Sequence, residues 1–196
     1  MSDEEPYDYD AARRAASDLW LREQIQARLE RFHAERPPVF AAPGVLHGDI
    51  ADWVKRFLAG EAAGLILVGN VGVGKSWSVW KVKESLIRAG WLRPVEIRAA
   101  HELKRITAPP VDEDELELLR EASLLALDDI GSIRVSDWDA DNLMALIDDR
   151  WKFQRPTVLA SNNPKLRDLL GERVASRLAD GATVVKMTGT DLRRAQ

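Results

Sequence analysis

A chain of 196 residues, 45% of them hydrophobic and none of them cysteine, suits one α/β domain with a short appendage and excludes disulfide frameworks, thiolate zinc sites and cysteine catalysis. The net charge of -4 gives no general attraction to nucleic acid, so any DNA contact requires a local basic patch. No apolar run reaches the length of a membrane span, and the first residues are acidic where a signal peptide is basic, which predicts a cytoplasmic protein with no membrane partner.

The N-terminal part of the chain predicts an extension ahead of the main domain. Residues 1–10 carry acidic side chains and no basic one, and we expect them to form a disordered tail. Residues 11–35 predict one long helix, which the proline- and glycine-rich break over 37–44 ends. Its apolar stripe consists of Leu21, Ile25, Leu29 and Phe32. This stripe must meet either the chain's own domain or a partner protein, and we assign residues 11–45 to partner binding.

Residues 46–196 alternate between helices and short apolar strands, the pattern of a parallel sheet flanked by helices. The strands are expected over 65–68, 94–98, 123–127, 157–161 and 183–187. The helices are expected over 49–58, 75–88, 100–106, 112–121, 137–153, 165–169 and 172–178. In the helix 137–153, Leu143, Met144, Ile147 and Trp151 have the spacing of core-facing residues.

A glycine-rich loop follows the first strand and fits the G-x-x-x-x-G-K-[ST] pattern at every fixed position. The glycines allow the backbone to curl so that its N–H groups cradle phosphate oxygens, and the next helix adds the positive end of its dipole. Lys75 can reach the β- and γ-phosphates, and the Ser76 hydroxyl can bind Mg²⁺. The predicted nucleotide-binding residues are Gly69, Asn70, Val71, Gly72, Val73, Gly74, Lys75, Ser76 and the adjoining Trp77.

Polar residues also follow two later strands, at the edge where the phosphate loop lies. Asp128 and Asp129 end the strand 123–127, and carboxylates there suit a Mg²⁺ ligand and a residue that orients the attacking water. An acidic cap of the following turn is the alternative reading. Asn162 follows the strand 157–161 and can hold the same water against the γ-phosphate, although Asn163-Pro164 can also form a simple turn.

The segment Gly171–Leu178 places Arg173 and Arg177 on one helix face, because they lie four residues apart. An arginine that meets the nucleotide of a neighbouring subunit can neutralise charge on the transferring phosphoryl group. A solvated or salt-bridged helix face near Glu172 and Asp180 explains the pair equally well when it is taken alone.

Together these motifs resemble those of one family. Their order, through Leu127-Asp128-Asp129-Ile130-Gly131 to Gly171–Leu178, is similar to that of the DnaC/DnaI-type helicase loaders and the related IstB transposition helpers, which are AAA+ ATPases. The segment Gly189–Arg193 resembles the closing motif of that family, with Leu192 in place of an aromatic residue. The likeness covers about residues 48–194 and implies a lidless AAA+ P-loop NTPase domain with a short N-terminal helical extension.

The resemblance also implies roles for the residues already named. The Walker A, Walker B and sensor 1 residues would be Lys75 with Ser76, Asp128 with Asp129, and Asn162. Ser76 and Asp128 would hold the Mg²⁺ of ATP. Arg177 would be an arginine finger and Arg173 a second arginine at the same interface between subunits.

The function implied by the resemblance is an ATP-dependent loader of a hexameric replicative DNA helicase. Such a protein would self-assemble with ATP, place the helicase on single-stranded DNA, and hydrolyse ATP slowly unless assembly or DNA stimulates it. Candidate contacts to DNA phosphates are Arg93, Arg98, Lys104 and Arg105. The alternatives are an IstB-like transposition helper on duplex DNA and a nucleotide-binding adaptor with little hydrolysis. A small-molecule kinase fits less well, because no segment resembles an arginine-rich substrate lid.

Overall fold

A five-stranded parallel sheet forms the centre of the molecule, whose computed structural model describes residues 9–131, 137–189 and 191. The strands are β1 (Leu65–Gly69), β2 (Val95–Ala99), β3 (Leu124–Asp128), β4 (Thr157–Ser161) and β5 (Thr183–Met187). They lie in the order β2-β3-β4-β1-β5, and every neighbouring pair is parallel. The predicted parallel sheet is confirmed, and each strand lies within one residue of its expected position.

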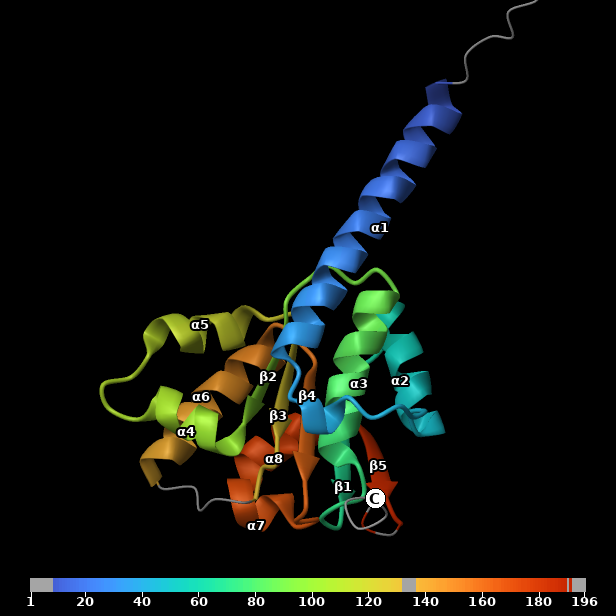
Figure 1. Ribbon diagram of the computed structural model, residues 1–196. Coiled ribbons are helices and arrows are strands. Elements are labelled where there is room, and N and C mark those ends of the chain that lie inside the picture. Colours follow the sequence, from blue (N-terminus) through green and yellow to red (C-terminus); the bar gives the residue numbers. More distant parts are fainter. Residues whose placement is uncertain (1–8, 132–136, 190, 192–196) are drawn as a thin grey trace, which may run out of the picture.

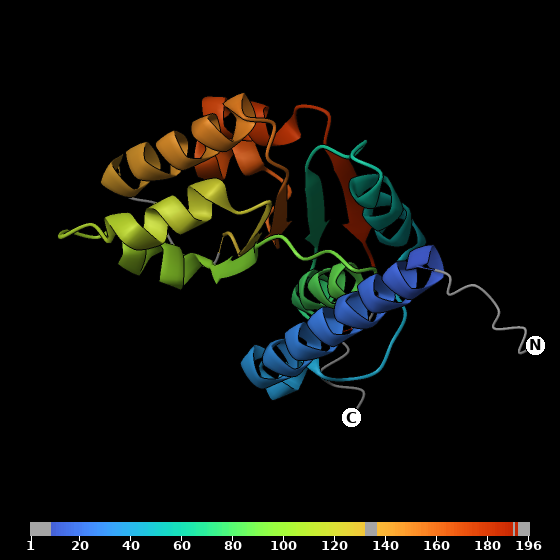
Figure 2. The ribbon, with the colours of Figure 1, turned by 90° about the horizontal axis from the view of Figure 1, so that it is seen from above.

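Helices cover both faces of this sheet (Figures 1 and 2). One face carries α2 (Gly48–Leu58) and α3 (Lys75–Arg88), with α1 (Tyr9–Glu35) on the outer side of α3. The other face carries the remaining helices, which are α4 (Ala100–Thr107), α5 (Glu113–Glu121), α6 (Asp137–Lys152), α7 (Leu166–Leu170) and α8 (Glu172–Ala179). A short 3-10 turn, η1 (Pro38–Phe40), connects the end of α1 to the linker before α2.

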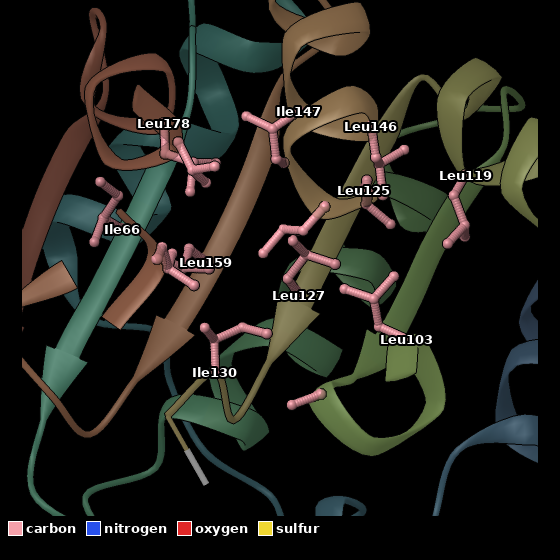
Figure 3. Close-up of a cluster of buried hydrophobic side chains, with 14 of the residues drawn as sticks. Ile66, Leu103, Leu119, Leu125, Leu127, Ile130, Leu146, Ile147, Leu159 and Leu178 are labelled. Carbon is pink, nitrogen blue, oxygen red and sulfur yellow. The ribbon is translucent and has the colours of Figure 1, made fainter. Parts of the chain in front are cut away.

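Alternation along each strand divides the core into two layers, because successive side chains of a strand point to opposite faces. Leu125 and Leu127 of β3 pack with helices α4 to α8, whereas Leu124 and Ala126 pack with α2 and α3. Figure 3 shows the first layer, in which Leu146, Ile147 and Leu178 from the helices approach the strand residues. The central strands β1, β3 and β4 are therefore buried on both faces, as parallel strands between two helix layers must be.

Helix α1 is only partly packed on the domain, and its N-terminal part projects away from it (Figure 1). Near its C-terminal end, Leu29 and Phe32 are buried against Ile87 of α3 in a separate small cluster. Further out, Leu19 and Trp20 are 59% and 56% exposed. Of the apolar stripe predicted for this helix, three residues therefore pack on the chain's own domain, namely Ile25, Leu29 and Phe32.

The N-terminal boundary also differs from the expectation, because α1 begins at Tyr9 and includes the last two residues assigned to the acidic tail. Residues 1–8 of that tail lie outside the described part of the chain. Among the residues that the structure describes, no helix combines the length and the apolar character needed to cross a bilayer.

The linker between α1 and α2 is held against the start of α3 by two tryptophans. The indole Nε1 of Trp77 donates a hydrogen bond of 2.8 Å to the carbonyl oxygen of Ala42. A Cβ on Gly44 would lie 2.8 Å from the Trp77 ring, so the linker backbone passes directly over this indole. Trp80 stacks on Phe40 of η1 with the ring centroids 6.1 Å apart. The linker is thereby attached to the helix that begins at the phosphate loop.

Candidate nucleotide site

The order of the strands brings three sequence motifs to one edge of the sheet. Strand β4 lies between β1 and β3, with Val68 paired to Ser161 and Leu127 paired to Leu159. The phosphate loop follows β1, the two aspartates end β3, and Asn162 follows β4. Because all three strands are parallel, their carboxyl ends lie together, with Asn162 on the strand between the other two motifs.

The phosphate loop needs glycine at several positions for two different reasons. Gly72 and Gly74 have φ values of 85° and 90°, in the left-handed region that side chains disfavour. Gly69 and Gly72 also lie close to other residues, since a Cβ on Gly69 would collide with the Met187 carbonyl and one on Gly72 with the Asp191 carboxylate. Met187, at the end of β5, and Asp191 therefore pack directly on the loop.

Lys75 begins helix α3 and is almost fully buried beneath the loop. Its Nζ donates hydrogen bonds of 2.8 Å and 2.7 Å to the carbonyl oxygens of Gly69 and Asn70. These acceptors are neutral, and a phosphate oxygen is a stronger, charged acceptor for an ammonium group. The first N–H groups of α3 have no partner within the helix and add positive potential at the same place. The loop therefore fits an anionic phosphate group.

Ser76 and Asp128 meet across the sheet edge. The Ser76 hydroxyl donates a hydrogen bond of 3.0 Å to Asp128 Oδ1. Asp128 is buried, and this burial raises the pKa of its carboxyl, although the hydrogen bonds from Ser76 and from the Asp129 backbone act in the opposite direction. A hydroxyl and a carboxylate side by side are the oxygen donors that Mg²⁺ takes from the protein at nucleotide sites. The two residues predicted to hold Mg²⁺ are thus in contact and fit the ion chemically.

Asp129 differs from its neighbour in exposure and in backbone conformation. It has a φ of 55°, a left-handed conformation that is uncommon for a residue other than glycine. Its backbone N–H donates 2.9 Å to Asp128 Oδ1, while its own side chain is exposed. The turn thus places the two neighbouring carboxylates in different environments. That of Asp128 is buried beside Ser76, and that of Asp129 faces solvent. Backbone strain of this kind is frequent at functional sites.

The segment after β4 is tied to the segment after β3. The Ile130 N–H donates 3.0 Å to the Ala160 carbonyl, and the Ser161 hydroxyl donates 2.5 Å to the Ile130 carbonyl. Asn162 lies beside the same turn, because a Cβ on Gly131 would be 3.0 Å from Asn162 Oδ1. Glycine at position 131, with a φ of 121°, therefore leaves room for the Asn162 amide. These bonds fix the position of Asn162 relative to the aspartate pair.

The two arginines of α8 lie against α6. Arg177 Nε donates 3.1 Å to Asp148 Oδ1, and Arg173 Nη2 donates 3.5 Å to Asp148 Oδ2. The Arg177 bond is the main reason why the pKa of Asp148 lies below its ordinary value. The salt-bridged helix face considered from the sequence is present, but its carboxylate is Asp148 of α6 rather than Glu172 or Asp180.

Comparisons with known proteins point in one direction. No model of a known protein family matches the chain. The replicative helicase loader DnaI of Bacillus subtilis is 26% identical over 117 residues, which are 58% of this chain and 38% of that protein. The chain therefore spans well under half the length of this curated relative.

Solved structures share the fold. A crystal structure of DnaI matches with a TM-score of 0.66 at 21% identity, covering 81% of this chain and 95% of that one. The DnaC helicase loader matches with a TM-score of 0.61 at 22% identity, over 76% of this chain and 96% of that one. A replication initiator DnaA bound to AMPPCP and single-stranded DNA matches with a TM-score of 0.63 at 18% identity, over 76% of this chain and 48% of that one.

The fold is that of the AAA+ P-loop NTPases. In sequence and in fold the chain is similar to the DnaC/DnaI-type helicase loaders. The residues predicted from the sequence as Walker A, Walker B and sensor 1 lie at one edge of this sheet, and the two arginines predicted to act between subunits lie on α8.

Trp77 has a different environment from the one that its place beside the Walker A loop suggested. Its indole N–H is taken by the Ala42 carbonyl and its ring lies beneath Gly44. The contacts of this side chain are therefore with the linker, and its assignment to nucleotide binding stays a prediction. No sequence pattern indicated this role, because the linker and Trp77 are joined only by the fold.

The basic residues proposed to contact DNA differ in their ion pairs and in their exposure. Arg98 donates to Glu96 at 2.9 Å and to Glu115 at 3.0 Å, and these carboxylates offset its charge. We therefore remove Arg98 from the candidate set. Lys104 and Arg105 of α4 are exposed, and the exposed Arg93 lies over the Trp91 ring. These three residues remain candidates.

Proposed function

We propose that this chain is an ATP-dependent loader of a replicative DNA helicase. The observation that carries the proposal is the contact between Ser76 and Asp128, with Lys75 beneath the same loop, in a chain whose sequence resembles a helicase loader. That contact joins Walker A to Walker B, which is the minimum arrangement for binding a magnesium nucleotide. The nucleotide analogue in the related DnaA structure supports ATP as the ligand.

In the proposed mechanism, Lys75 and the first N–H groups of α3 bind the β- and γ-phosphates. Bound Mg²⁺ would neutralise charge on the phosphate oxygens, and Ser76 and Asp128 are the residues that would hold it. Asp129, exposed beside this pair, orients or deprotonates the attacking water, and Asn162 positions the same water from the neighbouring strand. The hydrolysis is expected to be slow in the isolated chain, because the arginine comes from another subunit.

We further propose that ATP promotes self-association and that Arg177, with Arg173 beside it, completes the site of the next subunit. Both arginines lie on the side of α8 that faces α6, where the Arg177 and Arg173 side chains remain 30% and 69% exposed. An arginine finger supplied by a partner raises turnover by about 10³-fold or more. Arg177→Ala should therefore retain ATP binding and lose turnover to about that extent.

The projecting part of α1 is proposed to contact the helicase. Its exposed large apolar side chains include Leu19 and Trp20, whereas Phe32 is engaged with α3. Exposed large apolar side chains that cluster on one element are typical of interaction sites. Weak, sequence-independent binding of single-stranded DNA through Arg93, Lys104 and Arg105 completes the proposal, and the single-stranded DNA in the related DnaA structure supports it.

The test is the loading of helicase on a closed circle of single-stranded DNA. A ring-shaped helicase cannot thread onto a circle, so displacement of a labelled oligonucleotide annealed to the circle reports ring opening and placement. We expect the host replicative helicase to displace the oligonucleotide only when this chain and Mg·ATP are added. Lys75→Ala should abolish the effect, whereas Lys83→Ala, a lysine of the same helix paired with Glu35, should not. Unchanged displacement with the wild-type chain would contradict the loader function.

A further inference from the structure

Arg177 is held by two residues of α6 that the sequence did not single out for this role. Asp148 accepts a hydrogen bond from Arg177 Nε at 3.1 Å. Trp151, one helical turn further along, presents its ring to the guanidinium, whose central carbon lies 3.6 Å from the ring centroid. The side chain is therefore held both at its edge, by the hydrogen bond, and on its face, by the cation–π contact.

The two supporting residues are themselves fixed. Trp151 Nε1 donates a hydrogen bond of 2.7 Å to Asp180 Oδ2, at the end of α8, which sets the orientation of the ring. The Asp148 carboxylate also receives Lys152 Nζ at 3.3 Å and Arg173 at 3.5 Å, and its side chain is only 13% exposed. The guanidinium of Arg177 thus rests on a support built from both helices.

The terminal nitrogens of Arg177 are not used in this arrangement. Within the described residues, its hydrogen bond and its ion pair involve Nε alone, and neither Nη1 nor Nη2 has a polar partner. These two nitrogens form the fork that binds phosphoryl oxygens in a bidentate manner. The contacts at the edge and on the face restrict the rotamers of this long, flexible side chain and leave its fork unpaired. The entropy cost of ordering the side chain is then not subtracted from the free energy gained when the fork binds a phosphoryl group.

We propose that Asp148 and Trp151 are positioning residues that orient Arg177 for the nucleotide of a neighbouring copy of the chain. This inference rests on the proposed function, in which Arg177 acts between subunits. Under it, the two α6 residues do not touch the substrate, and their effect on turnover passes entirely through Arg177. If these contacts only linked α6 to α8, their loss would instead lower the stability of the fold. Salt bridges as exposed as the Arg173–Asp148 pair contribute little to that stability.

A mixing experiment with complementary variants tests the inference. Arg177→Ala serves as the recipient, because it keeps its own nucleotide site and lacks the arginine. Asp129→Asn serves as the donor, because it keeps Arg177 and lacks the residue proposed to activate water. Each variant alone is expected to be nearly inactive, and the mixture is expected to hydrolyse ATP.

The donor is then changed on α6. Trp151→Leu or Asp148→Asn, added to the donor, should lower the restored rate about tenfold, whereas Trp151→Phe should keep most of it because the aromatic face remains. Phe153→Leu is the matched control, since the Phe153 ring lies beneath a different guanidinium, that of Arg155, whose central carbon is 5.1 Å from the ring centroid. Melting temperature and nucleotide affinity of each donor show whether it is folded.

The outcomes separate the two levels of the proposal. If the unmodified donor restores no hydrolysis, the action of Arg177 between subunits is wrong, and the positioning role is lost with it. If the unmodified donor restores hydrolysis and folded donors with Trp151→Leu or Asp148→Asn restore it equally well, the positioning role alone is overturned. A selective loss with these two changes, and none with Phe153→Leu, supports it.

Discussion

Ser76 Oγ lies 3.0 Å from Asp128 Oδ1, although the two residues are 52 positions apart in the chain. The contact exists because α3 begins at the carboxyl end of β1 while Asp128 ends β3, two positions away in the sheet. A hydroxyl at the helix start and a buried carboxylate are thereby brought together at the edge of the sheet.

Asp128→Asn should stabilise the chain while it removes turnover. Burial raises the pKa of the Asp128 carboxyl, so the folded chain binds this proton more tightly than the unfolded chain does. The ionised form therefore costs folding free energy above the raised pKa, and wild-type stability should increase as the pH falls through it toward the ordinary value. The variant should lack this pH-dependent gain and melt higher at neutral pH by roughly 2–4 °C per kcal/mol relieved. Calorimetry across pH checks the sign, and a lower melting temperature would contradict it.

Lys75→Ala should weaken ATP binding roughly 10- to 150-fold, because hydrogen bonds to charged groups are worth about 1.5–3 kcal/mol. The neutral carbonyls of Gly69 and Asn70 that Lys75 contacts remain within the loop, so the fold should persist. Titration with a fluorescent ATP analogue measures the affinity. Lys83→Ala is the control and should bind like the wild type, and equal affinity of both variants would exclude Lys75 from the phosphate site.

Much of the fold could be predicted from local pattern. The apolar runs of β1, β3 and β4 are short, flanked by turn residues and buried on both faces, and they lie within one residue of their expected positions. The Walker A loop also could be identified, because glycines, lysine and serine at fixed spacing leave few other readings. These features depend on residues that are neighbours in the chain.

Features that depend on distant residues could not be predicted. Trp151 has the spacing of a core residue, yet it is 37% exposed, and its ring packs against the guanidinium of Arg177, which comes from beyond an intervening strand. The spacing of the apolar stripe of α1 does not show whether the stripe packs on the domain or on a partner. The partners Ile87 and Trp80 are residues of α3, and only the fold brings them to α1. Periodicity shows that a residue needs a partner but does not show which one.

Arg150 is a further residue of this kind, and it should be essential for stability. It is 1% exposed and donates from Nη1 to the carbonyls of Leu119 and Ala122 at 2.8 Å each, from Nη2 to that of Pro156 at 2.6 Å, and from Nε to the Thr157 hydroxyl at 3.0 Å. Burial lowers its pKa to about 9, which leaves it charged at neutral pH.

Both Arg150→Leu and Arg150→Lys should lower the free energy of unfolding by about 3 kcal/mol or more, because several buried carbonyls lose their donor and an ammonium cannot replace the planar fork. Urea denaturation measures this effect. Arg155→Lys, at a position that makes a single such carbonyl contact among the described residues, is the matched comparison and should cost less. A loss below about 1 kcal/mol at position 150 would contradict the structural role.

Phe32→Ala should detach α1 from the domain without unfolding the sheet. Phe32 is 1% exposed, but its cluster with Leu29 and Ile87 is separate from the two core layers. Removing a buried Phe side chain costs about 3–5 kcal/mol, which exceeds what this small cluster can offset. Hydrogen exchange should show faster exchange in α1 and an unchanged rate in β1 and β4. Trp20→Ser, on the exposed part of the same helix, should change neither. Protection of α1 that survives Phe32→Ala would show that other contacts hold it.

The central claim is that this chain binds a replicative helicase and that the binding depends on the nucleotide. Light scattering after size-exclusion chromatography tests this claim most directly. The chain and the host helicase are mixed in ATP and in ADP, with Leu19→Ser/Trp20→Ser as the variant that changes the exposed part of α1 alone. We predict a complex of defined mass that depends on the nucleotide and is lost in the variant, whose ATP affinity remains that of the wild type. Absence of a complex in both nucleotides would contradict the account.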